Sequence, residues 1–110
     1  MNYACFVSGP YSNEPELNTK KAIEAADKLI SMGILPLVPH LWHYHDAYFK
    51  RDYETWLKMS LMMLDRADFL LRLPGESSGA DKEVSEAEKR DIPVFYSFEE
   101  LQEAIEVGIL

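Results

Sequence analysis

The chain has 110 residues, 47% of them apolar, and its 19 acidic against 11 basic residues give a formal net charge of −8. This length suits one domain, residues 1–110, with a single core, and leaves no room for a second. The charge opposes binding of a nucleic acid polymer or an anionic membrane surface, whereas a small phosphorylated ligand remains compatible with it.

Cysteine content and hydropathy limit the covalent links that the chain can form and the places in the cell where we expect it. Cys5 is the only cysteine, which excludes an internal disulfide and a cysteine-based metal site. No apolar run is long enough to span a bilayer, and the N-terminus lacks the basic and apolar regions of a signal peptide. We therefore expect a cytoplasmic protein that does not associate with a membrane.

The first part of the chain predicts a strand, a helix and a second strand. Residues Tyr3 to Ser8 form a short apolar run that a Gly-Pro turn ends. From about Glu16 to Met32 small and apolar residues recur at helical spacing. Ile34 to Val38 predicts the second strand, and Pro36 within it favours an edge position.

Residues Pro39 to Arg51 are aromatic, rich in histidine and aperiodic, which predicts a structured loop after the second strand. Such loops line ligand crevices in open α/β sheets. His40, His43 and His45 have the spacing H-x-x-H-x-H, but neither a helical i,i+4 pair nor a cysteine supports zinc. We therefore expect no metal site. We expect instead that the imidazoles stack on a nucleobase or hydrogen-bond to it.

A second helix, from about Asp52 to Arg66, is apolar on two sides. One side carries Tyr53, Trp56, Leu57, Ser60, Leu61 and Leu64, and the other carries Met59, Met62 and Met63. Two explanations stay open: the helix is crowded by its own loops, or the methionine side forms a homo-oligomer interface. Ser60 interrupts the apolar side, as expected either for a position that faces a cavity or for a serine bonded to its own helix.

The second half continues the alternation. Ala67 to Leu73 predicts a third strand, Ala80 to Arg90 a third helix, and Ile92 to Tyr96 a fourth strand. Ser97 then caps a last helix. Four strands alternating with four helices predict a parallel sheet with right-handed crossovers and helices on both faces.

The segment from Leu71 to Glu83 carries the clearest functional signal, because an apolar strand enters a Gly/Ser turn that opens a helix. We expect Glu83 in the first helical turn, where backbone N–H groups bind anions and hold a carboxylate ionised. Glu83 is then either a nucleophile beside a sugar phosphate or an acid that only stabilises the helix dipole. Ser77, Ser78 and Gly79 are either helix caps or ligands of a phosphate or sugar hydroxyl.

Together these segments resemble the nucleoside 2-deoxyribosyltransferase-like superfamily, in particular its small bacterial and phage members. The matching motifs are Ser8-Gly9-Pro10-Tyr11, Leu35 to Leu41, Tyr53 to Trp56, Arg72 to Glu83 and Ile92 to Phe95. The resemblance covers nearly the whole chain. It implies a flavodoxin/Rossmann-like three-layer αβα sandwich with a parallel sheet of four to five strands, and it implies no cofactor.

The resemblance also implies roles for individual residues. Glu83 would attack the anomeric carbon to form a covalent 2-deoxyribosyl intermediate. Ser60 stands where the family has an aspartate that protonates the departing base, and loss of such an acid typically costs ~10²–10⁴-fold in rate. The substrate-binding positions would be Gly9, Pro10, Tyr11, His40, Ser77, Ser78 and Gly79.

The expected function is therefore cleavage of an N-glycosidic bond, or deoxyribosyl transfer, on a (deoxy)nucleoside or its 5′-monophosphate. Ser77 favours the monophosphate, because related deoxynucleotide N-hydrolases contact the phosphate with a serine at this position. Two alternatives stay open because of Ser60: a non-catalytic nucleotide-binding module, and an oligomeric structural protein with a degenerate site.

Overall fold

Four parallel strands form the middle layer of the computed structural model, which describes residues 1–108. They are β1 (Tyr3–Ser8), β2 (Ile34–Leu37), β3 (Phe69–Arg72) and β4 (Val94–Phe95), in the order β2-β1-β3-β4. β1 and β3 are central, and Pro36 lies in the edge strand β2, as predicted. The strand order reverses direction between β1 and β3, which is where ligands bind in open α/β sheets.

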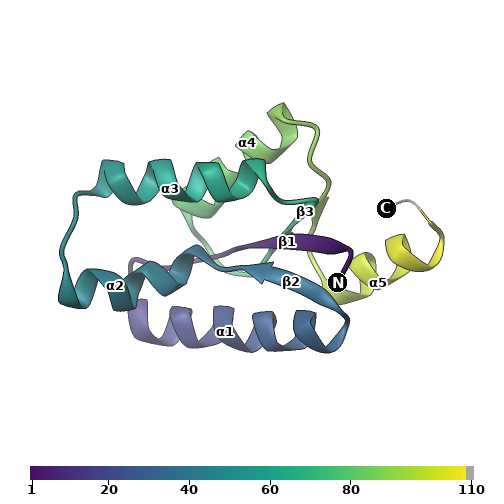
Figure 1. Ribbon diagram of the computed structural model, residues 1–110, viewed down its shortest axis with the longest axis horizontal. Coiled ribbons are helices and arrows are strands. Elements are labelled where there is room, and N and C mark those ends of the chain that lie inside the picture. Colours follow the sequence, from purple (N-terminus) through teal and green to yellow (C-terminus); the bar gives the residue numbers. More distant parts are fainter. Residues whose placement is uncertain (109–110) are drawn as a thin grey trace.

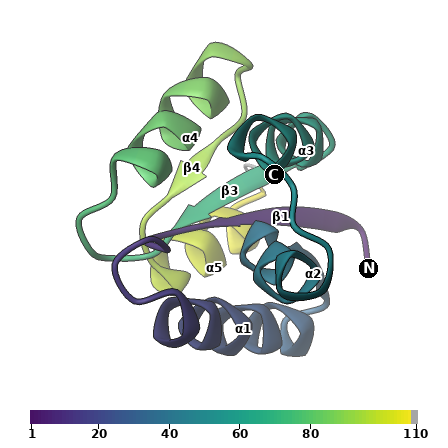
Figure 2. The same cartoon turned by 90° about the vertical axis from the view of Figure 1, so that its left-hand side faces the viewer.

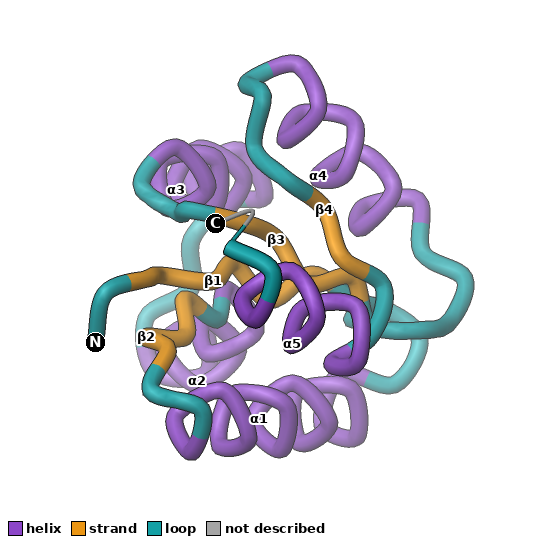
Figure 3. Tube along the Cα trace, turned by 90° about the vertical axis from the view of Figure 1, so that its right-hand side faces the viewer, coloured by secondary structure: helices purple, strands orange, loops and turns teal. Residues whose placement is uncertain are grey.

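Helices cover both faces of this sheet (Figures 1 and 3). α1 (Pro15–Ser31) and α5 (Phe98–Glu106) pack on one face, and α3 (Tyr53–Asp65) and α4 (Ser78–Lys89) pack on the other. Ser97 caps α5 by accepting a hydrogen bond from the Glu100 N–H at 3.1 Å. The predicted three-layer α/β/α fold is confirmed, with four strands.

The alternation of side chains along the central strands divides the core into two clusters. Cys5 and Val7 of β1 pack with α1 and α5, whereas Phe6 packs with α3 and α4. By the same alternation, Ser8 and Arg72 at the ends of β1 and β3 lie on the α3/α4 side. Two polar residues thus end the strands beneath the same pair of helices.

The expectation of a loop over residues 39–51 is wrong. This segment forms a short 3₁₀ helix, η1 (Pro39–Leu41), followed by α2 (Trp42–Tyr48). α2 has no buried residue, so it lacks the apolar periodicity by which a helix is recognised in sequence. Figure 2 shows α2 below α3, both at the end of the molecule that faces the viewer.

The arrangement of the methionines on α3 also differs from the expectation. Met63 packs against the core cluster that contains Phe6 and Leu64, whereas Met62 is exposed and Met59 half-buried. The exposed methionine side of α3 is therefore smaller than predicted. Within residues 1–108, no helix combines the length and the apolar character needed to cross a bilayer.

Candidate active site

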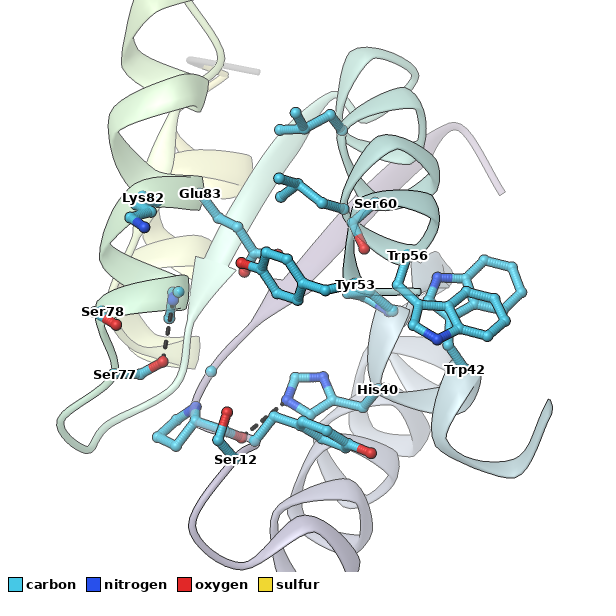
Figure 4. A pocket seen from close by; sticks show the side chains of 18 of the residues that line it. Ser12, His40, Trp42, Tyr53, Trp56, Ser60, Ser77, Ser78, Lys82 and Glu83 are labelled. Carbon is cyan, nitrogen blue, oxygen red and sulfur yellow. Dashed lines mark hydrogen bonds between the residues drawn. The ribbon is translucent and has the colours of Figure 1, made fainter. Parts of the chain in front are cut away.

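A pocket of about 760 Å³ opens at the carboxyl ends of β1, β2 and β3 (Figure 4). The turn after β1, the η1–α2 segment, α3 and the start of α4 all contribute to its walls. Every site residue predicted from the sequence lines it: Gly9, Pro10, Tyr11, His40, Ser60, Ser77, Ser78, Gly79 and Glu83. The fold thus gathers side chains from four separate segments of the chain.

Glu83 lies in the second turn of α4, because the helix begins at Ser78. The expected first-turn position is therefore wrong, and Asp81 is the acid of the first turn. One carboxylate oxygen of Glu83 accepts a hydrogen bond from the Ser8 hydroxyl at 2.7 Å. Burial raises the pKa of Glu83 to about 7, although the Ser8 hydrogen bond and the charge of Arg72 both lower it.

Arg72 is a buried arginine beneath this wall of the pocket, and the sequence pattern predicts no role for it. Its guanidinium donates to the Gly75 carbonyl at 3.0 Å and to the Asp81 carboxylate at 3.1 Å, and it also donates to the Leu73 carbonyl. It therefore ties the turn after β3 to the first turn of α4. The only sequence signal was a charged residue at the end of a buried apolar run.

The turn after β3 packs closely on the turn after β1. Gly75 has a φ of +116°, and a Cβ built there would lie 2.8 Å from Cγ of Pro10. A side chain at this position would be strained and would force the two turns apart. Glycine at position 75 thus brings the Pro74–Gly75 turn against the Gly9–Pro10 turn.

Ser77 is the N-cap of α4, and its hydroxyl oxygen accepts a hydrogen bond from the Ala80 N–H at 3.0 Å. Ser78 and Gly79 follow as the first exposed residues of the helix. Capping therefore accounts for one lone pair of Ser77. Its hydroxyl hydrogen stays available to a ligand acceptor.

α2 and α3 form the opposite wall, which is aromatic. The rings of Trp42 and Trp56 stack with centroids 5.8 Å apart and an interplanar angle of 12°. The indole N–H of Trp56 donates to the Asp46 carboxylate at 2.9 Å. Ser60 is buried on α3 and lines the pocket with Tyr53, and Figure 4 shows both on the side of α3 that faces α4.

The three histidines turn toward different neighbours. His40 is buried, contacts the Pro10 carbonyl through Nε2 at 3.1 Å, and has a pKa lowered by burial. His43 contacts the Tyr11 hydroxyl at 2.8 Å, and His45 packs edge-on against Trp56. Within residues 1–108, no three or more His, Cys, Asp or Glu side chains gather in a way that could hold a metal ion.

Comparison with known proteins shows the family of this chain. A family model described as "Domain of unknown function (DUF7768)" matches residues 3–97. The chain belongs to this family. A search of the curated proteins finds no match.

The DUF7768 chain is also similar to a solved structure of a 2-deoxyribosyltransferase from the psychrotolerant bacterium Bacillus psychrosaccharolyticus. The TM-score is 0.66 at 21% sequence identity, and the likeness covers 83% of this chain and 69% of the other. At this identity the likeness shows a shared fold.

The pocket of this DUF7768 chain combines two kinds of chemistry. Its α4 side presents a carboxylate whose pKa of about 7 allows both a charged and a protonated form near neutrality. Its α2–α3 side presents flat aromatic rings and the hydroxyl of Ser60. Such an arrangement can hold a planar ligand on one side and bring an electrophilic carbon to a carboxylate on the other.

Proposed function

We propose that this chain cleaves the N-glycosidic bond of a (deoxy)nucleoside or its 5′-monophosphate, or transfers the deoxyribosyl group, with Glu83 as the nucleophile. The observation that carries the proposal is the Glu83 carboxylate, hydrogen-bonded to Ser8, on the wall of a pocket that also holds aromatic rings. The fold shared with a 2-deoxyribosyltransferase supports the same reaction class.

In the proposed first step, the free oxygen of Glu83 forms a bond to the anomeric carbon of the sugar. The bond from that carbon to the base breaks, and its electron pair leaves with the base, which takes up a proton. Water or a second base then forms a bond to the same carbon and gives up a proton to solvent, while the bond to Glu83 breaks and the carboxylate is regenerated. Two displacements give retention, and the fixed negative charge stabilises the oxocarbenium-like transition state.

Proton supply to the leaving base is the weak part of this site. Ser60 supplies a hydroxyl from α3, and a serine hydroxyl has no pKa near neutrality. We expect water to protonate the base, at a cost of ~10²–10⁴-fold relative to a positioned acid. The enzyme is then slow, or prefers bases that leave easily.

The start of α4 is the proposed place of a 5′-phosphate. Ser77, Ser78 and Gly79 line the pocket there, and the hydroxyl hydrogen of Ser77 is available to an acceptor. Lys82 lines the same part of the pocket and adds a positive charge. A helix N-terminus also favours an anion.

A base-release screen over nucleosides and their 5′-monophosphates tests the proposal. We expect release by the wild type and its loss in Glu83→Gln, which keeps the shape but removes the charge. Glu88→Gln is the matched control, because Glu88 is exposed on the same helix outside the pocket. Release that persists in Glu83→Gln contradicts the assignment of the nucleophile.

Ser60 favours a second candidate, a module that binds a nucleotide without turning it over. In that case 5′-monophosphates raise the melting temperature of the wild type and of Glu83→Gln alike, while no base is released. Turnover by the wild type excludes this candidate.

A further inference from the structure

Ser8 is the last residue of the central strand β1 and is fully buried. In the sheet it pairs with Arg72, the last residue of β3. Most buried hydroxyls in proteins are hydrogen-bonded, and the partner of Ser8 is the carboxylate of Glu83, which lies 75 positions away in the chain. The contact therefore joins the middle of the sheet to the helix that carries the proposed nucleophile.

The geometry of this contact restricts the glutamate. A glutamate side chain has three rotatable bonds, whereas a serine on a buried central strand has little freedom. The Ser8 hydroxyl donates to one oxygen of Glu83 at 2.7 Å, an ordinary length for an O–H···O hydrogen bond. The second oxygen is left for the pocket, into which the Glu83 side chain reaches from α4 in Figure 4.

We propose that Ser8 is the positioning residue of this site: it holds one oxygen of Glu83 so that the other faces the anomeric carbon. The inference rests on the proposed function and deepens it. Because the hydrogen bond favours the charged carboxylate, Ser8 also extends the range of pH over which Glu83 is ionised.

Charged and titratable groups also lie in β3 and in the walls of the pocket. Arg72 approaches from β3 and lowers its pKa, which leaves Ser8 and Arg72 as the two groups that oppose the effect of burial. The pocket also contains His40 from η1, Asp46 from α2, Tyr53 from α3, and Lys82 and Glu86 from α4. Ser8 differs from all of these because it touches the carboxylate directly without carrying a charge.

The test compares Ser8→Ala with Thr19→Val. Thr19 is also fully buried, and its hydroxyl has no hydrogen-bond partner within residues 1–108, so Thr19→Val removes a buried hydroxyl without breaking a contact. We expect the acidic limb of kcat/KM for base release to move up by roughly one pH unit in Ser8→Ala, with a plateau about tenfold lower. Thr19→Val should keep the wild-type profile. A Ser8→Ala profile that coincides with the wild-type profile overturns the proposal.

A second measurement separates this inference from the proposed function. The side-chain carboxyl carbon of Glu83 is titrated by ¹³C NMR, with Glu83→Gln identifying its signal. The midpoint should rise in Ser8→Ala and rise less in Ser8→Cys, because a thiol is a weaker donor. If the wild type releases no base from any substrate, the proposed function fails. The titration still shows whether Ser8 acts on the Glu83 carboxylate.

An unchanged midpoint in both variants overturns the positioning role. Ser8→Cys nearly preserves the side-chain volume, so it provides the comparison with the wild type even if Ser8→Ala does not fold.

Discussion

The two walls of the pocket are built in different ways. On the α4 wall, Glu83 is hydrogen-bonded to Ser8, and Arg72 ties the preceding turn to the helix. On the opposite wall, α2 has no buried residue, and Tyr48 and Phe49 at its end are 84% and 70% exposed. In Figure 1 this end of α2 and the start of α3 extend away from the sheet.

The difference suggests that the two walls have different functions. A reacting group must be held in place, and the central strands of a sheet are the most rigid support that a small domain offers. Side chains that recognise a flat ligand tolerate small shifts, because stacking depends weakly on lateral position. We therefore expect substitutions on the α4 wall to change stability and chemistry, and those on the α2–α3 wall to change mainly ligand affinity.

The largest expected effect comes from Arg72→Leu. It removes the donor from the Leu73 and Gly75 carbonyls and from Asp81, and we expect a loss of ~3 kcal/mol in the free energy of unfolding. The comparison is Arg66→Leu: Arg66 follows the end of α3 outside the pocket, is exposed and donates one hydrogen bond, to the Met62 carbonyl at 3.1 Å, and we expect a change within ~0.5 kcal/mol. Urea unfolding measures both changes. Equal losses of unfolding free energy in the two variants contradict the greater importance of the α4 wall for stability.

Ser60→Asp tests whether the α3 wall can acquire chemistry. A carboxyl group at this buried, pocket-lining position has a pKa raised by burial and can protonate a leaving base. We expect the rate of base release to rise by ~10²-fold. Ser60→Asn, which has nearly the same shape without the acid, serves as the control. Equal rates in the two variants refute the role of the acid.

The pH dependence of stability provides a third test. The folded-state pKa of Glu83, about 7, lies above the ordinary value of 4.5, so the folded state binds the proton more tightly than the unfolded state. This stabilisation is fully present below pH 4.5 and is lost as the pH rises through 7. Glu83→Gln should therefore gain stability over the wild type by about 3 kcal/mol between pH 4 and 8. A constant difference in melting temperature between the two proteins across this range excludes the raised pKa.

The smallest expected effect belongs to the aromatic wall. Trp42→Leu removes the stack on Trp56, and since the indole N–H of Trp42 has no hydrogen-bond partner within residues 1–108, no such bond is lost. We expect a loss of ~1 kcal/mol in nucleotide binding with little change in kcat. Calorimetric titration measures the affinity. A fall in kcat larger than the fall in affinity contradicts the idea that this wall serves only to bind the ligand.

The α4 wall and the sheet were more predictable from sequence than the α2–α3 wall. Apolar runs such as Tyr3 to Ser8 predicted the central strands, and the Gly/Ser turn predicted the start of α4 to within two residues, because both signals are local. α2 was missed because it buries no side chain, so its sequence shows no helical pattern.

The internal contacts of the site were beyond sequence reasoning for another reason. The sequence predicts Ser8 as the end of a strand, and nothing local reveals a partner 75 positions away. Arg72 was part of a matching motif, but its three acceptors are defined only once the turn after β3 has folded. The composition of the pocket was thus predicted, whereas the contacts that orient its residues were not.

The stack of Trp42 on Trp56 has a practical consequence. These are the only two tryptophans of the chain, and both line the pocket. The intrinsic fluorescence of the protein excited at long wavelength therefore originates at the site itself. A nucleobase that stacks on these rings quenches that emission, so the unlabelled wild-type protein reports its own ligand occupancy.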